Sequence, residues 1–171
     1  MELRKVTGED AEELFRVITE SLDHLRVWMP WAAGGYDEAM LAEFLADAAE
    51  GWDRGALFPH VITVDGAIVG LATAHRTREP DLVEIGYWLH PAHTGRGHVT
   101  AAVAELAEFA FALDGVRRIQ IWHDEANLAS SGVPRRLGFT EVDRRTPPRE
   151  PAIGNRVGVD VVWELRRSRG E

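Results

Sequence analysis

One segment, residues 84–98, narrows the possible folds of this chain more than any other. Its sequence is Glu-Ile-Gly-Tyr-Trp-Leu-His-Pro-Ala-His-Thr-Gly-Arg-Gly-His. A strand-like run leads into Pro91, and Gly95 and Gly97 stand directly before a helical pattern. Apolar residues recur in that pattern at spacings of 4, 3, 3 and 4 (Val99, Val103, Leu106, Phe109 and Leu113). Glycines let backbone N–H groups approach a ligand closely, and a helix N-terminus adds unpaired donors and partial positive charge. The segment therefore predicts either a phosphate or pyrophosphate site or a simple tight turn.

Hydrophobic periodicity along the rest of the chain predicts a mixed sheet with helices on its faces. Strands are expected at residues 3–6, 58–64, 67–74, 81–90, 116–122, 139–144 and 157–165, and helices at residues 11–25, 37–52, 95–113 and 127–137. The Asp65-Gly66 connection between two of these strands is typical of a hairpin. The fold class is therefore α/β (α+β), with about seven strands and about four helices. Residues 145–156, which contain three prolines, are expected to form a long loop of a kind that is often functional.

The composition limits the chemistry that the chain can carry. The length of 171 residues predicts one domain over residues 1–171. The absence of cysteine excludes a disulfide framework, a thiolate zinc site and an acyl-cysteine intermediate, and the histidines show no metal-ligand spacing. The net charge of −9 argues against a nucleic-acid binder. No apolar run approaches the ~20 residues of a membrane span, and the polar start lacks a signal-peptide core, so the chain is expected to be cytoplasmic.

The charge is unevenly distributed. Residues 1–60 carry a net −8, residues 61–114 a net −4 and residues 115–171 a net +3. One interpretation is a set of solvated helix faces. The other is an acidic side that attracts a cationic substrate and a more basic side nearer an anionic ligand.

Four stretches resemble, in order along the chain, the motifs of one enzyme family. Glu84-Ile-Gly-Tyr-Trp-Leu89 followed by Gly95-Arg96-Gly97 resembles the acetyl-CoA-binding motif of the GNAT N-acetyltransferase superfamily. Trp28-Met-Pro-Trp31 resembles the Trp-Leu/Met-Pro-Trp motif of the RimJ/RimL-type ribosomal-protein N-terminal acetyltransferases. The same enzymes have an Asn-x-x-Ser helix followed by a strand, which resembles Asn127-Leu-Ala-Ser130 followed by Leu137-Gly-Phe139. Their final strand is similar to Asp160-Val-Val-Trp-Glu-Leu165. The resemblance covers nearly the whole chain.

This resemblance implies a GNAT-like, mostly antiparallel twisted sheet that splays open near its middle, with acetyl-CoA bound in the cleft as cosubstrate. It implies that the backbone of Leu89 pairs with the pantetheine. It also implies that the CoA pyrophosphate lies on the backbone amides of Thr94, Gly95, Arg96, Gly97, His98 and Val99. The family usually carries Arg, Lys or Gln where Ala92 and Thr94 stand, so less side-chain help to the phosphates is expected. The absence of cysteine fits direct transfer of the acetyl group to an amine.

Direct transfer needs a neutral amine, a polarised thioester carbonyl and a proton for the leaving thiolate. Glu84, on the strand that leads into the cofactor loop, is the candidate base, acting through a water molecule. The alternative is a solvent-facing strand glutamate. Many GNAT enzymes protonate the thiolate with a tyrosine on the later helix, which is excluded here because Tyr36 and Tyr87 are the only tyrosines.

The helix expected at residues 127–137 carries the second candidate catalytic group. By the resemblance, Ser130 lies near the cofactor sulfur, with Ser131 as the adjacent alternative, and Asn127 hydrogen-bonds the cofactor. Asn and Ser are also common helix caps, which is the alternative for these residues. Gly132 and Pro134 interrupt this stretch, and a proline costs ~3 kcal/mol or more inside a helix. Either the helix begins at residue 128 and kinks at Pro134, or regular helix begins only at residue 133 or 134, and either outcome could move Ser130 away from the sulfur.

Three aromatic residues have both a structural and a functional interpretation. By the resemblance, Trp28 and Trp31 line the acceptor pocket, and the alternative is two aromatic rings packed on the core. His123 follows an expected strand and precedes Asp124, so it is a candidate base near the acceptor or, alternatively, a loop histidine.

These observations predict an N-acetyltransferase that transfers an acetyl group from acetyl-CoA to a primary amine. The acceptor is expected to be a protein N-terminus or a cationic small-molecule amine, with no nucleic acid, membrane or metal involved and a homodimer possible. A non-catalytic acyl-CoA-binding module is the first alternative, motivated by Pro134. A nucleotide-binding module is the second, although the sequence offers no residue to read a ribose or a base.

Overall fold

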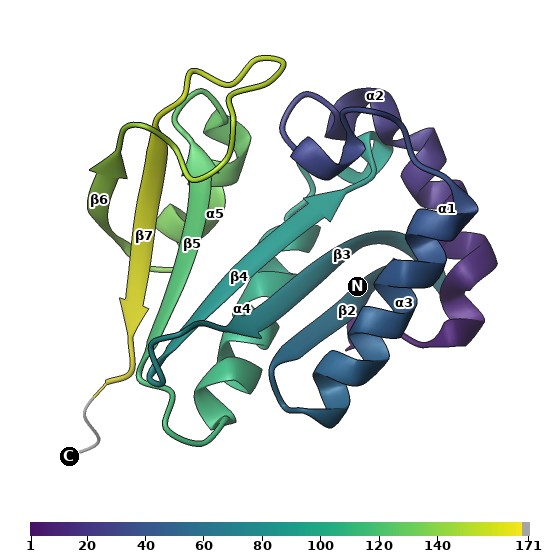
Figure 1. The fold of residues 1–171 in the computed structure, drawn as a ribbon. Coiled ribbons are helices and arrows are strands. Elements are labelled where there is room, and N and C mark those ends of the chain that lie inside the picture. The colour runs from purple at the N-terminus through teal and green to yellow at the C-terminus, as the bar shows by residue number, and fades with distance from the viewer. Residues whose placement is uncertain (169–171) are drawn as a thin grey trace.

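A computed structural model describes residues 1–168 and contains a seven-stranded sheet in the order β1-β2-β3-β4-β5-β7-β6 (Figure 1). The strands are β1 (Glu2–Lys5), β2 (Leu57–Val64), β3 (Ala67–Arg76), β4 (Leu82–Leu89), β5 (Arg118–Asp124), β6 (Thr140–Arg145) and β7 (Asp160–Arg166). Every neighbouring pair is antiparallel except β4 and β5, which run parallel. The predicted fold class, a mixed and mostly antiparallel sheet, is confirmed.

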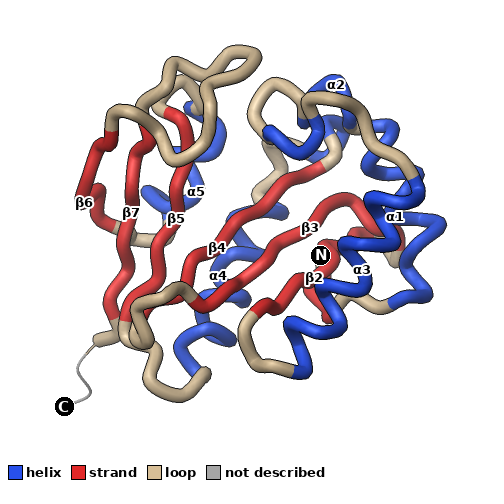
Figure 2. The backbone as a smooth tube through the Cα atoms, in the orientation of Figure 1, coloured by secondary structure: helices blue, strands red, loops and turns tan. Residues whose placement is uncertain are grey.

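Helices cover both faces of the sheet (Figure 2). The helices are α1 (Ala11–Glu20), α2 (Leu22–Leu25), α3 (Glu38–Asp53), α4 (His98–Ala112) and α5 (Leu128–Arg136). Short 3-10 turns occur at η1 (Gly8–Asp10), η2 (Pro30–Ala32) and η3 (Pro91–His93). Helices α1 and α3 pack on β2 and β3, whereas α4 and α5 pack on the opposite side. None of the helices in the described part is both long and apolar enough to cross a membrane.

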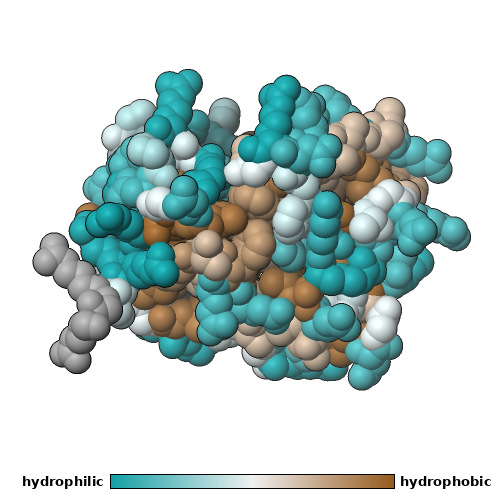
Figure 3. Space-filling view, turned by 90° about the horizontal axis from the view of Figure 1, so that it is seen from below, coloured by the Kyte–Doolittle hydropathy of each residue, from teal (hydrophilic) through white to brown (hydrophobic). Residues whose placement is uncertain are grey.

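Two apolar clusters hold these layers together. One joins the sheet to α4 and includes Ile62, Val103, Leu106, Ile119 and Ile121, and the other joins it to α1 and α3 through Leu14, Val17, Leu41, Val61 and Leu71. Fully burying side chains of this kind stabilises the fold by roughly 1.5–3 kcal/mol each. Hydrophilic side chains cover much of the end seen in Figure 3, with hydrophobic patches between them.

The sheet opens between β4 and β5. These strands pair only at Leu82↔Arg118, Val83↔Ile119 and Glu84↔Gln120, and beyond Glu84 they diverge (Figure 1). The remaining length of β4 therefore has a free edge that faces β5 across a gap. Glu84 lies at the vertex of this V-shaped opening.

Most expected element boundaries differ from the structure by only one or two residues, but three larger differences have a local reason. Helix α4 begins at His98 and not at residue 95, because Gly95 and Gly97 have φ values of 74° and 78°, outside the helical region. The helix expected at residues 11–25 is divided at Ser21 into α1 and α2, which makes five α-helices. Strand β7 begins at Asp160 and not at residue 157, because the amides of residues 157 and 158 donate to Asp124.

Candidate active site

A continuous cleft follows the opening between β4 and β5. It consists of two cavities, of about 640 Å³ and about 430 Å³. Both are lined by Trp28, Met29, Tyr87, Trp88, Asn127 and Ser130. Because these residues line both cavities, the two cavities adjoin at Tyr87 and Ser130.

The smaller cavity lies at the N-terminus of α4. Of the residues expected to bind the cofactor, it is lined by Leu89, Thr94, Gly95, Gly97, His98, Val99 and Asn127, whereas Arg96 is exposed and is not among its lining residues. Gly97 caps the helix in the left-handed conformation. Within the described residues, the backbone N–H groups of residues 95–100 donate no hydrogen bond. These free donors at the positive end of a 15-residue helix suit an anionic group such as a pyrophosphate.

Helix α5 begins at Leu128 and contains Pro134, so the earlier of the two predicted starts is correct. The Asn127 carboxamide caps it, because Oδ1 accepts from the Ser130 amide at 3.2 Å. The two serines then differ in what they face. Ser131 is buried and its hydroxyl donates to the Leu128 carbonyl at 2.8 Å, whereas Ser130 lines both cavities.

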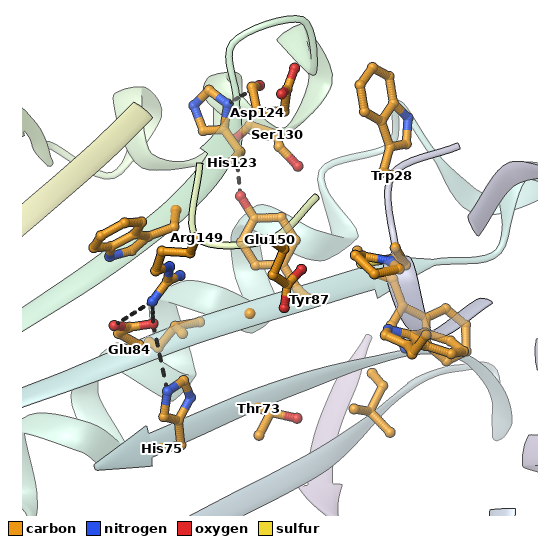
Figure 4. A pocket seen from close by; sticks show the side chains of 18 of the residues that line it. Trp28, Thr73, His75, Glu84, Tyr87, His123, Asp124, Ser130, Arg149 and Glu150 are labelled. Carbon is orange, nitrogen blue, oxygen red and sulfur yellow. Dashed lines mark hydrogen bonds and ion pairs between the residues drawn. The ribbon is translucent and has the colours of Figure 1, made fainter. Parts of the chain in front are cut away.

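Glu84 lines the larger cavity and is not a freely solvated strand residue, since its side chain is 13% exposed (Figure 4). Both of its carboxylate oxygens accept from Nη1 of Arg149, at 3.0 and 2.9 Å. The Arg149 guanidinium also stacks 3.5 Å from the ring centroid of Trp122 on β5. One arginine therefore connects the carboxylate at the end of the β4–β5 pairing to the opposite arm of the sheet.

His75 was not predicted as a site residue, yet it lies directly beside Glu84. The two residues are cross-strand neighbours on β3 and β4, with His75 Nε2 3.6 Å from the Glu84 carboxylate. Desolvation lowers the pKa of the imidazole, with Glu84 opposing the shift and Arg149 adding to it. The neutral ring therefore predominates at pH 7. The sequence did contain a signal for His75 as a site residue, because alternation along β3 places it on the same face as Thr73, which also lines the cavity.

The long loop predicted between the last two strands is present between β6 and β7, and its residues Arg149, Glu150 and Arg156 line the larger cavity. Asp124 accepts backbone hydrogen bonds from Ala126, Val157 and Gly158, all at 3.0 Å, and Asp160 accepts from the Arg149 amide at 2.8 Å. These carboxylates anchor both ends of the loop to β5 and β7.

The same loop contacts the opposite side of the cleft. At Gly154 a Cβ atom would lie 2.8 Å from the carbonyl oxygen of Val27, so only glycine fits against that backbone. Arg156, whose side chain is 7% exposed, lies 3.4 Å from Asp160 and 3.7 Å from Asp124. The loop therefore bridges the two arms of the sheet above the larger cavity.

Trp28 and Trp31 belong to the cavity and to neither of the two core clusters. Trp28 lines both cavities, whereas Trp31 lines the larger one and is 39% exposed. Trp31 makes an edge contact with Tyr36 at 5.5 Å between ring centroids and approaches Trp88 at 6.4 Å. One wall of the larger cavity is thus aromatic, which suits the apolar or cationic part of a ligand.

His123 lies inside β5 and not after a strand as predicted. Its Nε2 accepts from the indole N–H of Trp163 at 2.8 Å, and its Nδ1 lies 2.7 Å from the Asp124 carbonyl oxygen. Burial lowers the pKa of this imidazole. Both ring nitrogens are therefore occupied within the protein, which does not favour His123 as a base.

The acidic first third of the chain contributes only in part to the cleft. Glu43 and Asp47, one turn apart on α3, line the larger cavity, whereas the other acidic residues of residues 1–60 do not. Glu84, Asp124 and Asp160 also line it but have arginine partners. In residues 1–168, no group of three or more histidine or carboxylate side chains is arranged to hold a metal ion.

Comparison with known proteins places this geometry among acetyltransferases. Residues 1–140 match the family described as an acetyltransferase (GNAT) domain. The Bacillus subtilis (strain 168) protein YdaF, whose name assigns it provisionally as a ribosomal N-acetyltransferase, is 29% identical over 147 residues, which cover 81% of this chain and 77% of YdaF.

Solved structures share the fold at low sequence identity. A RimL ribosomal L7/L12 α-N-protein acetyltransferase in complex with CoA has a TM-score of 0.87 at 19% identity, over 96% of this chain and 92% of that one. Mycobacterium smegmatis RimJ with a CoA disulfide has a TM-score of 0.82 at 24% identity, over 96% and 80%. The microcin C7 self-immunity acetyltransferase MccE, in complex with acetyl-CoA and AMP, has a TM-score of 0.81 at 21% identity, over 93% and 88%.

Proposed function

Because the chain belongs to the GNAT acetyltransferase family, we propose that it transfers an acetyl group from acetyl-CoA directly to a cationic primary amine, either a protein N-terminus or a small molecule. Family membership makes the chain an acetyl-CoA-dependent N-acetyltransferase and gives no support to a non-catalytic acyl-CoA-binding module. The proposal adds to this the roles of individual residues and the class of acceptor.

The chain offers what acetyl-CoA needs. The free amides of residues 95–100 suit the pyrophosphate, the unpaired edge of β4 as far as Leu89 suits the pantetheine, and Ser130 lies where the two cavities meet. When bound, acetyl-CoA supplies the acetyl thioester. We assign the acceptor amine to the larger cavity, because the smaller one has the features of an anion site.

The transfer then requires three proton movements. Glu84, through a water molecule, takes a proton from the acceptor ammonium, and the free amine forms a bond to the thioester carbonyl carbon. The carbon–sulfur bond breaks, and Ser130 donates a proton to the departing thiolate. The nitrogen of the new amide gives up its second proton to the Ser130 oxygen, which restores the hydroxyl. His75, neutral beside Glu84, is a second group able to take up a proton in the larger cavity.

The observation that carries this proposal is that the two cavities meet at Ser130, with Glu84 on the acceptor side. The test is an assay of CoA thiol release from acetyl-CoA over amines, aminoglycosides and peptides with free N-termini, with product masses determined. Turnover of a cationic amine supports the proposal. CoA binding without turnover of any amine in the panel would contradict it.

Glu43 and Asp47 are expected to favour cationic acceptors, because they line the larger cavity and have no ion-pair partner within the described residues. The Glu43→Gln/Asp47→Asn double variant should raise KM for a cationic acceptor by about 3- to 10-fold at low salt, and less at high salt. The Glu50→Gln/Asp53→Asn pair removes the same charge from the same helix outside the cleft and serves as the matched control. Equal changes in KM for both pairs would contradict a direct role.

Gly97 is expected to be needed for CoA affinity. Its φ of 78° costs an alanine about 1–2 kcal/mol, so Gly97→Ala should relax the loop and raise Kd for CoA about tenfold. Isothermal titration calorimetry measures the change. Gly8→Ala is the control, because Gly8 has no positive φ and no atom within 4 Å of the added Cβ. An unchanged Kd in Gly97→Ala would mean that the amide cradle does not depend on this conformation.

A further inference from the structure

Pro134 leaves an unpaired acceptor in the middle of α5. In a regular helix the carbonyl of Ser130 accepts from the amide of residue 134, four positions later. Proline has no N–H, so this bond is absent, although the helix continues to Arg136. A carbonyl left without a partner in a buried place costs free energy comparable to a lost hydrogen bond.

The hydroxyl of Tyr87 supplies the missing donor. Its oxygen lies 3.0 Å from the Ser130 carbonyl oxygen (Figure 4), and the bond joins residues 43 positions apart in the sequence. Tyr87 is on the β4 arm of the open sheet, whereas α5 packs on β5. The bond therefore crosses the cleft at the point where both cavities meet.

This bond fixes the backbone carbonyl of Ser130, in addition to its amide. The Ser130 amide already donates to Asn127, and the Ser130 carbonyl accepts from Tyr87, so both backbone groups of the residue are held. Only the side-chain hydroxyl remains free to face the cavities. Burial raises the pKa of the Tyr87 phenol well above its ordinary range, and its single proton is used in the bond to Ser130.

We propose that Tyr87 is a positioning residue that replaces the backbone donor lost at Pro134 and thereby holds Ser130 at the junction of the acceptor and cofactor cavities. The proposal rests on the role proposed above for Ser130. It assigns Tyr87 no proton transfer of its own. The effect of replacing Tyr87 should accordingly depend on whether residue 134 is a proline.

A double-mutant cycle tests the coupling, because Pro134→Ala restores an amide N–H to the helix. Tyr87→Phe alone should lower kcat about tenfold with both KM values changed less than about twofold, a tenfold loss being ~1.4 kcal/mol. In the Pro134→Ala background, the same substitution should lower kcat less than about threefold. Arg135→Ala is the matched control background, because it changes the neighbouring exposed residue without adding a donor, and there the tenfold loss should persist.

Equal losses of kcat in the Pro134→Ala and Arg135→Ala backgrounds would overturn the coupling. A melting-temperature loss without a loss of kcat, measured well below the melting temperature, would overturn the positioning role. If the unmodified protein acetylates no amine, the proposed function fails, but the thermal cycle still tests the pair. Tyr87→Phe should then lower the melting temperature by about 2–4 °C per kcal/mol lost, and Pro134→Ala should remove that loss.

Discussion

Glu84→Gln is expected to lower kcat/KM for the acceptor amine by about 100-fold near pH 6, the lower end of what general-base catalysis contributes. The amide keeps the size of the side chain and an acceptor for Arg149, but it cannot take up a proton. At higher pH more of the acceptor is already deprotonated, so the difference from the unmodified enzyme should narrow. The measurement is kcat/KM from pH 5.5 to 9.5 with the best amine found in the thiol-release assay.

Loss of the ion pair has to be separated from loss of the base. Arg149→Gln breaks the same pair and leaves the carboxylate in place, so it should retain the shape of the pH profile. A constant ratio between Glu84→Gln and the unmodified enzyme at every pH would remove Glu84 as the base. In that outcome His75, 3.6 Å away, is the next group to replace, by His75→Gln.

Asp124→Ala is expected to lower the free energy of unfolding by about 3–5 kcal/mol, the usual loss when one member of a buried ion pair is removed. The Asp124 side chain is 2% exposed, and its loss would leave three backbone amides and one side of the buried Arg156 guanidinium without their partner. Denaturant unfolding monitored by tryptophan fluorescence measures the change. Hydrogen exchange should show faster exchange in residues 146–159, which Asp124 and Asp160 anchor.

The pH dependence of this effect has a definite sign. Burial tends to raise the pKa of Asp124, but the amides of Val157, Ala126 and Gly158 and the charge of Arg156 outweigh it and leave the pKa lowered. The stabilisation is therefore complete above the unfolded pKa of about 3.9 and is lost as the pH falls through the lower folded value. The difference in the free energy of unfolding between the unmodified protein and Asp124→Ala should therefore narrow in that acidic range.

Asp143→Ala is the matched control for Asp124→Ala, because Asp143 is an exposed aspartate that also pairs with an arginine and accepts a backbone amide. It should cause a much smaller loss, since solvent replaces both interactions. A loss for Asp124→Ala no larger than that for Asp143→Ala, with unchanged exchange in the loop, would show that the anchor is not needed.

The sequence alone determined the features that depend on neighbouring residues. The Asp65-Gly66 hairpin, the apolar faces of the helices and the glycines before α4 are local patterns, and they led to the sheet, the family and the cofactor loop. An expected element boundary was wrong where a residue adopts a backbone conformation outside the helical region, as Gly97 does before α4. Glu84, Ser130 and Trp28 were identified as lining a site, although their chemical roles stay predictions.

The tertiary structure alone decided which of these groups meet. Arg149 is 65 positions from Glu84, Ser130 is 43 from Tyr87, and Val157 is 33 from Asp124. None of these contacts has a sequence signal, because each joins elements that only the folded chain brings together: the β6–β7 loop with β4 or β5, and helix α5 with β4. Periodicity indicates which face of an element is buried, but only packing brings distant elements together, and the partners of Glu84 and Ser130 belong to that second category.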